Sequence, residues 1–363
     1  MKIFVVLPEF GGGGAERAHL YLMNEWVKND NQVYLILINK KGDLLKFLDK
    51  RISIIDLNSK RMIKAIIPIY NLIKIHKPKI ILAAMWPLTS IVTFSWLFSF
   101  KIGKLFLADH NPLIKSWTKD LNINWHYFCF IYNITYIFCT KIISVSDKVK
   151  EQSQKILFIR KNNFKVIYNP VRSADKYNLN IPLIRKKLFG DFRYCLISVG
   201  RLKKSRDLTT LIDSFSLIKN YKQTKLIILG EGPEKDFLNV YIKEKKLENN
   251  IQINGYVEDP YPYYLCSDIY IHSSIYDAMP LVLIEALICG SNIISTDCDS
   301  GPKEILDNGK YGSLIPISKP SIMAKEIDLQ LTQKKNTIKI KERSKIFTIK
   351  KISHQYLNLF ISS

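Results

Sequence analysis

The chain contains several segments whose residue types suit a polar or phosphorylated ligand, and the first is a run of four glycines, Gly11–Gly14. Glycines let a backbone approach a ligand closely, and a helix that begins beside them directs N–H groups at an anionic or polar group. A flexible turn is the alternative, although four glycines cost more conformational entropy than a turn alone requires. No Gly-Lys-Ser/Thr follows, and the spacing does not match a dinucleotide fingerprint. We therefore predict that Gly13, Gly14 and Glu16 contact a bound ligand.

Short segments that contain glycine and positive charge follow apolar runs in the second half of the chain. The segment after Tyr194–Val199 contains Arg201 and Arg206. Ligands of parallel α/β sheets bind at the carboxyl ends of the strands, so a nucleotide would meet these segments there. The other candidates in such segments are Gly200, Gly230, Gly232, Tyr256 and Val257.

Two carboxylates and a histidine complete the candidate residues. Asp277 and Glu285 are separated by seven residues, and a helix that starts between them would offer backbone N–H groups to phosphate. His110 ends an apolar run; its neutral imidazole can bond a sugar hydroxyl or help to manage a proton, although a lone histidine is more often structural. The residues between the two carboxylates that we expect to contact a ligand are Ala278, Met279, Pro280, Leu281 and Val282.

Short β-branched runs that alternate with helical patterns must position these residues. Such alternation predicts doubly wound α/β domains with parallel sheets. In the first half we expect strands at Ile3–Leu7, Gln32–Ile38, Lys79–Ala84, Leu105–Ala108 and Lys141–Val145. In the second half we expect them at Tyr194–Val199, Lys225–Leu229, Ile251–Ile253, Ile269–Ile271, Asn292–Ser295 and Ser313–Ile315.

The 363 residues exceed what one hydrophobic core usually serves, so we expect two domains. The turn signal Asn169-Pro170 and the polar sequence after it place the boundary near Arg172. We predict an N-terminal domain of residues 1–172 and a C-terminal domain of residues 173–345, facing each other across a cleft. A final helix, residues 346–363, is expected to pack back on the N-terminal domain.

The charge of the chain is strongly positive, at +22, with 54 Lys and Arg against 32 Asp and Glu. Residues 1–180 carry +15 of this excess. Such an excess favours nucleic acid, anionic lipid or phosphorylated partners, but no nucleic-acid-binding module is recognisable. The six cysteines form no CxxC pair, which fits a reducing cytoplasm.

Two uncharged runs, Ile80–Phe100 and Leu121–Thr140, approach the length that spans a bilayer. Pro87 and neighbouring hydroxyl residues interrupt the first run, which therefore predicts a strand followed by a helix. The second run holds several Asn residues and a His, and predicts a buried or membrane-facing amphipathic helix in preference to a transmembrane helix.

The segments from Ser198 to Pro316 resemble the retaining glycosyltransferases of family four, which have the GT-B fold. The resemblance includes Asp277 and Glu285, at the spacing of the two glutamates that mark the family, so the first glutamate is an aspartate here. The segment Ser295–Leu306 is similar to members that build bacterial surface polysaccharides. The run Gly13–Arg17 fits the same group.

The resemblance implies a role for each candidate. Arg201 and Arg206 would stabilise the negative charge that develops on the departing nucleoside diphosphate, with Arg206 at a position where the family has lysine. Glu285 would accept both hydroxyl hydrogens of the nucleotide ribose, while Asp277 would face the donor sugar. His110 would lie near the transferred sugar.

A metal is not expected at Asp297-x-Asp299. A DxD pair holds a divalent ion in a different glycosyltransferase fold, but here it lies within the family-four segment, where arginines supply positive charge. We predict no cofactor beyond the donor substrate and no obligatory metal.

The resemblance implies a retaining transferase that moves a sugar, such as an N-acetylhexosamine, from a UDP-sugar to a lipid-pyrophosphate-linked saccharide. The positive charge favours attachment to an anionic membrane surface, on the cytoplasmic face of the inner membrane, and no nucleic acid partner is expected. Two alternatives remain open: a nucleotide-sugar epimerase or sugar phosphorylase of the same fold, and a non-catalytic basic membrane-binding protein.

Overall fold

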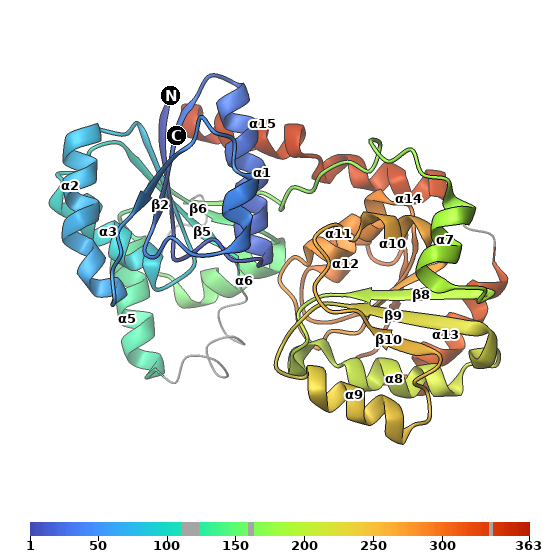
Figure 1. Ribbon diagram of the computed structural model, residues 1–363. Coiled ribbons are helices and arrows are strands. Elements are labelled where there is room, and N and C mark those ends of the chain that lie inside the picture. Colours follow the sequence, from blue (N-terminus) through green and yellow to red (C-terminus); the bar gives the residue numbers. More distant parts are fainter. Residues whose placement is uncertain (111–122, 159–162, 334–336) are drawn as a thin grey trace. The chain divides into compact units, whose positions relative to one another are not determined.

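The computed structural model describes residues 1–110, 123–158, 163–333 and 337–363. These residues form two compact units (Figure 1). Unit 1 comprises Met1–Val171 and Phe347–Ser363, and unit 2 comprises Arg172–Ile346. The division falls within one residue of the predicted boundary, and the last helix belongs to unit 1. The resemblance to family four implies that the N-terminal domain binds the acceptor and the C-terminal domain the nucleotide-sugar donor, and both roles stay predictions.

Unit 1 is built on a parallel sheet with the strand order β3-β2-β1-β4-β5-β6-β7. The order reverses between β1 and β4, as in a doubly wound fold. All five strands predicted for this half are present, whereas β3 and β7, two short strands at the edges, were not predicted. The strands are β1 (Lys2–Leu7), β2 (Gln32–Leu37), β3 (Ser53–Asp56), β4 (Ile80–Ala84), β5 (Lys104–Asp109), β6 (Lys141–Ser144) and β7 (Phe164–Val166).

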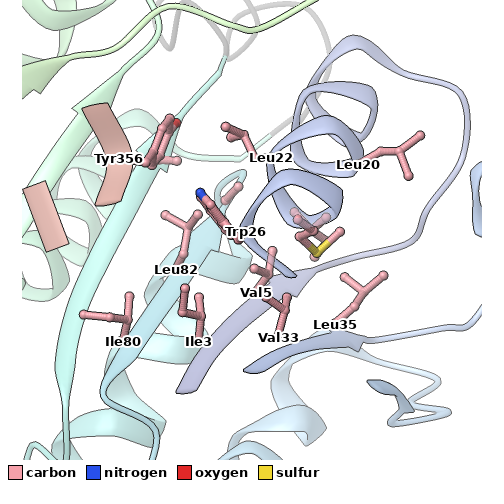
Figure 2. Packing of buried hydrophobic residues seen from close by; sticks show 14 of the residues in the cluster. Ile3, Val5, Leu20, Leu22, Trp26, Val33, Leu35, Ile80, Leu82 and Tyr356 are labelled. Atoms are coloured by element: carbon pink, nitrogen blue, oxygen red, sulfur yellow. The ribbon is translucent and has the colours of Figure 1, made fainter. Parts of the chain in front are cut away.

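Helices cover both faces of this sheet, because successive side chains of a buried strand point to opposite faces. On one face, Phe4 and Val6 of β1 pack against α2, α3 and α5. On the other, Ile3 and Val5 pack against α1 and α15; Figure 2 shows Trp26 of α1 among these residues. The helices of unit 1 are α1 (Gly14–Lys28), α2 (Ile66–His76), α3 (Leu88–Phe98), α5 (Trp125–Tyr136), α6 (Asp147–Ile156) and α15 (Ile349–Ser362).

The helix α15 comes from the far end of the chain but completes the core of unit 1. The ring centroids of Trp26 and Tyr356 lie 5.8 Å apart, and Phe360 lies 4.8 Å from Phe106 of β5. A backbone hydrogen bond of 3.0 Å from Val171 to Phe347 joins the two segments at which the chain leaves and re-enters unit 1. The chain therefore passes between the units twice, at adjacent points.

Unit 2 repeats the doubly wound plan with the parallel order β10-β9-β8-β11-β12-β13. All six predicted strands are present. They are β8 (Tyr194–Val199), β9 (Thr224–Leu229), β10 (Ile251–Ile253), β11 (Ile269–His272), β12 (Asn292–Thr296) and β13 (Ser313–Ile315). One face packs against α8, α9 and α13. The helices are α7 (Ile181–Phe189), α8 (Leu208–Leu217), α9 (Lys235–Glu244), α10 (Tyr261–Cys266), α11 (Leu281–Ile288), α12 (Pro302–Ile305), α13 (Pro320–Thr332) and α14 (Thr337–Ser344).

The two uncharged runs fold as elements of unit 1. The first forms β4 and α3, as predicted. The second contains α5, which buries Phe128, Tyr132 and Tyr136 against the sheet; residues 121 and 122 lie outside the described part. Across the described residues, we find no helix with the length and apolar character needed to cross a membrane.

Candidate functional site

A pocket lies at the carboxyl edge of the unit 2 sheet, where β8 and β11 are neighbours. The strand order reverses between these two strands, and ligands of open α/β sheets bind at such points. Residues that line the pocket include Ser198, Gly200, Arg206, His272, Ser273 and Ser274. Two predicted residues, Gly200 and Arg206, are therefore brought together there.

Arg206 and Asp277 form a buried ion pair beside this pocket, with about a fifth of each side chain exposed (19% each). Nη1 of Arg206 also donates to Ser274 Oγ at 2.9 Å and lies 3.1 Å from Nε2 of His272. Burial opposes ionisation of Asp277, but the charge of Arg206 outweighs it and lowers the pKa of this carboxyl to about 2. The site thus holds a permanent positive charge with its counter-ion.

His272 is buried and connects the ion pair to the next strand. Its Nδ1 lies 3.1 Å from Ser295 Oγ on β12, and its Nε2 lies 3.4 Å from Asp277 Oδ2. Burial lowers the pKa of His272, with the nearby Arg206 acting in the same direction and Asp277 opposing. The imidazole is therefore neutral at neutral pH.

Two of the three predicted glycines of unit 2 are required by close approach of backbone to backbone, and the third lies against a side chain. A Cβ added at Gly230, where φ is +145°, would lie 1.9 Å from the carbonyl oxygen of Gly200. A Cβ added at Gly232 would lie 2.2 Å from the carbonyl oxygen of Leu202. At Gly200, where φ is +154°, a Cβ would come 3.3 Å from Nε of Arg206. Packing of the loops after β8 and β9 explains the first two glycines, and space for Arg206 explains the third.

Glu285 lies in α11 and is buried, with 1% of its surface exposed. Its Oε2 accepts a hydrogen bond of 3.3 Å from the hydroxyl of Tyr264. Burial raises the pKa of Tyr264, and the negative charge of Glu285 adds to this shift. A surface carboxylate on the first turn of a helix, the ordinary alternative for this residue, is excluded by this burial.

The segment between the two carboxylates leads into α11. Pro280 precedes the helix, and Ala278, Met279 and Leu281 are buried while Val282 is half-buried. The first N–H groups of a helix lack partners within the helix, so those of α11 can donate to a phosphate, as predicted for this segment. Their contact with a ligand stays a prediction.

Three further predicted residues of unit 2 are open to solvent. Arg201 is exposed and makes no hydrogen bond or ion pair with any residue that the structure describes. Tyr256 is 47% exposed and Val257 is half-buried, in the loop after β10. They lie outside the group that contacts Arg206.

The glycine run of unit 1 leads into α1 as predicted, but the start of this helix is occupied. Gly13 precedes α1, and the carboxylate of Glu16 lies over it, since a Cβ at Gly13 would come 2.3 Å from Glu16 Oε2. Burial raises the pKa of Glu16. The position predicted for an anionic ligand group therefore already holds a carboxylate. A Cβ added at Gly12, by contrast, would meet nothing within 4 Å.

His110 lies at the carboxyl end of β5 and is buried beside His19 of α1, with ring centroids 5.0 Å apart. Nδ1 of His19 lies 2.8 Å from the carbonyl oxygen of Ala15. Among the described residues, neither ring nitrogen of His110 nor Nε2 of His19 has a hydrogen-bond partner. Burial lowers the pKa of His19 to about 4 and that of His110 well below its ordinary value. Two neutral imidazoles thus offer three nitrogens for which a ligand or water is the expected partner.

Asp109, the neighbour of His110, is fully engaged. Its carboxylate accepts hydrogen bonds from the hydroxyls of Tyr132 (2.7 Å), Tyr136 (2.8 Å) and Ser153 (3.0 Å). Burial raises the pKa of Asp109, and it outweighs the three hydrogen bonds, which lower the pKa. This carboxylate ties β5 to α5 and α6 and orients the chain at His110.

Sequence reasoning missed His272, Ser274 and His19. A signal for the first two was present, since both lie at the end of an apolar strand, as the predicted residues do. His19 gave no such signal, because its position in the middle of an amphipathic helix is typical of a core residue.

The cysteines and acidic residues give no metal site in the described part of the chain. All six cysteines are free thiols, and no group of three or more His, Cys, Asp or Glu side chains there could hold an ion. The expectation that Asp297 and Asp299 bind no metal stays a prediction.

Comparison with known proteins agrees with this architecture over the whole chain. The chain is 24% identical to a Campylobacter jejuni protein, N-acetylgalactosamine-N,N'-diacetylbacillosaminyl-diphospho-undecaprenol 4-alpha-N-acetylgalactosaminyltransferase, over 99% of both chains. It is 30% identical to an uncharacterised glycosyltransferase of Methanocaldococcus jannaschii over 217 residues, which is 56% of this chain and about half (53%) of that relative.

Solved structures share the fold. Anabaena HepE in complex with UDP superposes with a TM-score of 0.85 at 18% identity over 100% of both chains. The TarM structure superposes with a TM-score of 0.76 at 15% identity, over 100% of this chain and 99% of that one. The predicted GT-B class, with two Rossmann-like parallel-sheet domains, is confirmed.

Two family models match successive parts of the chain. Residues 12–174 match Glycosyltransferase Family 4, and residues 181–347 match Glycosyl transferases group 1. The chain is therefore a glycosyltransferase, whose first half matches the family 4 model and whose second half matches the group 1 model.

Proposed function

We propose that the chain transfers an N-acetylhexosamine from a UDP-sugar to a lipid-pyrophosphate-linked saccharide, with retention of the anomeric configuration, in the synthesis of a surface polysaccharide or lipopolysaccharide. The pocket of unit 2 carries this proposal, because buried Arg206 supplies positive charge at the point of the sheet where nucleotides bind. A leaving nucleoside diphosphate needs such a charge. Glu285, buried in α11, would accept the ribose hydroxyls.

The names of relatives support the choice of donor and acceptor. The Campylobacter relative is named as an N-acetylgalactosaminyltransferase that acts on a diphospho-undecaprenol-linked saccharide. HepE has been crystallised with UDP and with UDP-glucose. HepE supports a UDP-sugar donor, and the name of the Campylobacter relative supports transfer of an N-acetylhexosamine to a lipid-linked acceptor.

The donor is tested by thermal unfolding in the presence of UDP-, GDP-, TDP- and CMP-sugars. A ligand at a hundred times its dissociation constant stabilises the fold by about 2.7 kcal/mol. We expect UDP-sugars to raise the unfolding temperature, and Glu285→Gln to reduce this rise while Glu244→Gln, an exposed control at the end of α9, leaves it unchanged. Stabilisation by another nucleotide alone would contradict the donor assignment.

The reaction itself is tested with a UDP-sugar and a lipid-pyrophosphate-linked acceptor. We expect a product whose new bond keeps the α or β configuration of the donor, as read by NMR. Conversion of the UDP-sugar without acceptor would favour the epimerase. Transfer that continues at an unchanged rate in EDTA is expected, because arginines provide the charge that a metal would otherwise supply.

The attachment to an anionic membrane is part of the same proposal, and a face of unit 1 supports it. Residues 57–108 contain eight Lys and Arg and no Asp or Glu, so the chain through α2, β4, α3 and most of β5 carries only positive charge. The helix α5, which contacts α3, exposes Tyr127, Phe130 and Ile134 along one side, and the exposed Ile137 follows its last residue. Phe158 is 94% exposed, and its N–H donates to Asn133 of α5.

Lysines lie directly against exposed aromatic rings on this face. Nζ of Lys101 is 5.5 Å from the ring centroid of Phe138, and Nζ of Lys74 is 5.0 Å from that of Phe100, which is 83% exposed. Apolar rings that enter the headgroup region, together with lysines that attract anionic lipid at about 1 kcal/mol each, form a membrane-binding surface. We call Phe100, Tyr127, Phe130, Phe138 and Phe158, with Lys74 and Lys101, the aromatic–lysine face.

Flotation with vesicles tests this face. We expect the protein to bind phosphatidylglycerol vesicles and to bind phosphatidylcholine vesicles weakly. The double variant Phe100→Ser/Phe130→Ser should lose about tenfold in affinity, while the control Phe237→Ser/Val240→Ser, on exposed positions of α9, should not. Equal binding by both variants would contradict the proposal, as would a change from dimer to monomer on loss of the aromatic residues, which would assign the face to a second copy of the chain.

A further inference from the structure

The guanidinium of Arg206 is held by one end only. Among the residues that the structure describes, Nη1 makes all hydrogen bonds of the guanidinium, to Asp277, Ser274 and His272. Nε of Arg206 is buried and has no hydrogen-bond partner among the described residues, and it faces the space that Gly200 leaves by lacking a side chain. Nε and Nη2 form the edge of a guanidinium that binds two oxygens of a phosphate at once. The orientation of Arg206 therefore leaves this edge available to a ligand in the pocket.

Hydrogen-bond chemistry determines which nitrogen of His272 carries the proton. A guanidinium can only donate, so Nε2 of His272 must accept from Nη1 of Arg206. Nδ1 then carries the hydrogen and donates to Ser295 Oγ at 3.1 Å. The hydroxyl of Ser295 donates in turn to the carbonyl oxygen of Thr296 at 3.1 Å. Every group in this chain of bonds has a partner of the right kind only while His272 is neutral.

We propose that His272 is a positioning residue of the donor site, which fixes the guanidinium of Arg206 so that its Nε–Nη2 edge faces the diphosphate. The inference rests on the proposed function and adds to it a residue that does not itself touch the donor. Asp277 and Ser274 share the task, since Nη1 has two hydrogens for three acceptors.

Protonation of His272 would dismantle this arrangement. In the described part of the chain, the charged groups that face its ring are Arg206, from the loop after β8, and Asp277, from the loop after β11; the contact from β12 is the uncharged Ser295. An imidazolium would repel Arg206 and would donate to Asp277, 3.4 Å away, in place of the arginine. Donor affinity should therefore fall on acidification below the pKa of His272.

The test measures the dissociation constant of a UDP-sugar by calorimetry between pH 5 and pH 8. Both phosphates of a UDP-sugar are esterified and keep their charge over this range, so an acid limb reports on the protein. For the wild type we expect binding that weakens towards pH 5. His272→Leu should weaken binding by about tenfold at pH 7.5, the loss expected when a hydrogen bond to a charged group is removed.

His272→Gln is the decisive variant, because its amide oxygen can accept from Arg206 but cannot be protonated in this range. We expect affinity close to that of the wild type at pH 7.5 and no acid limb, whether or not the leucine variant folds. An acid limb that persists in His272→Gln, or a leucine variant that folds and binds as the wild type does, would overturn the proposal. A wild type that binds no UDP-sugar would instead overturn the proposed donor.

Discussion

The carboxyl edges of the two sheets hold similar residue types but differ in whether their polar side chains have partners within the protein. In unit 2, the buried charges of Arg206 and Asp277 satisfy each other, and His272 joins them to β12. In unit 1, the buried imidazoles of His19 and His110 keep nitrogens without partners among the described residues. A buried polar group without a partner costs about 1–3 kcal/mol. The charged groups at the edge of unit 2 are therefore already paired, although Nε of Arg206 lacks a partner among the described residues, whereas the two imidazoles of unit 1 leave three nitrogens without one.

The glycines of the two edges repeat this difference. Gly230 and Gly232 are required by backbone contacts between two loops, while Gly12 has open space around it. The same residue type thus serves internal packing at Gly230 and Gly232, whereas Gly12 meets no packing requirement. A run of glycines in a sequence therefore does not show by itself whether the glycines are required by packing or have open space around them.

Loss of the positive charge in unit 2 should have the largest effect. Arg206→Ala would leave the buried carboxylate of Asp277 unpaired, and we expect a loss of about 3–5 kcal/mol in the free energy of unfolding. Urea unfolding measures it. The double variant Arg206→Ala/Asp277→Asn should recover part of the loss, because it no longer contains the unpaired carboxylate. A double variant no more stable than Arg206→Ala would show that the ion pair is not what the arginine stabilises.

A matched pair of glycine substitutions, one in each unit, should differ in its effect on the free energy of unfolding. Gly230→Ala would place a Cβ against a carbonyl oxygen at a positive φ, and we expect a loss of about 3 kcal/mol. Gly12→Ala should change the free energy of unfolding by less than about 0.5 kcal/mol. Thermal and urea unfolding of both variants provide the measurement. Similar losses in both would mean that the glycine run is also held by packing.

The pH dependence of stability should report the burial of His19 in unit 1. The pKa of His19 is lowered from 6.5 to about 4 in the folded chain, so protons bind the unfolded chain preferentially and stability falls as the pH falls from about 6.5 to 4. At pH 5 this amounts to about 2 kcal/mol. His19→Gln should lack this loss. His272 is present in both proteins, and the pKa of His110 is lowered less when His19 is absent, which acts in the same direction. Parallel stability curves for the two proteins between pH 5 and pH 7 would contradict it.

The carboxylate that has partners should give the smallest effect and the opposite sign. The pKa of Asp109 is raised above 3.8, so the folded chain binds the proton better and the wild type loses stability as the pH rises through this raised pKa. Asp109→Asn should cost about 1 kcal/mol through weaker hydrogen bonds from Tyr132 and Tyr136, with a deficit that shrinks from pH 4 to pH 7. A stability deficit of Asp109→Asn that grows with pH would contradict the raised pKa of Asp109.

The parts of the fold that sequence could predict are those with a strong local pattern. Eleven predicted strands are present because buried parallel strands are continuous apolar runs, which are visible in the sequence. The edge strands Ser53–Asp56 and Phe164–Val166 are short and half-exposed, so they lack that pattern. The candidates that follow strands, such as Arg206, could be found for the same reason.

Contacts between distant residues could not be predicted in this way. Arg206 and Asp277 each stand out in the sequence, but their pairing depends on the order of strands in the sheet, which brings β8 beside β11. The pairing of His19 with His110 likewise depends on how α1 lies on the end of β5. Burial of Glu285 required the packing of α10 against α11.

The return of α15 to unit 1 has a consequence for the order of events during synthesis. Every strand and helix of unit 2 emerges from the ribosome before Tyr356 and Phe360, which the core around Trp26 requires. The unit that is translated second can therefore reach its native packing first, while the earlier one waits with apolar surface uncovered. A chaperone that acts on this chain should be found on nascent unit 1.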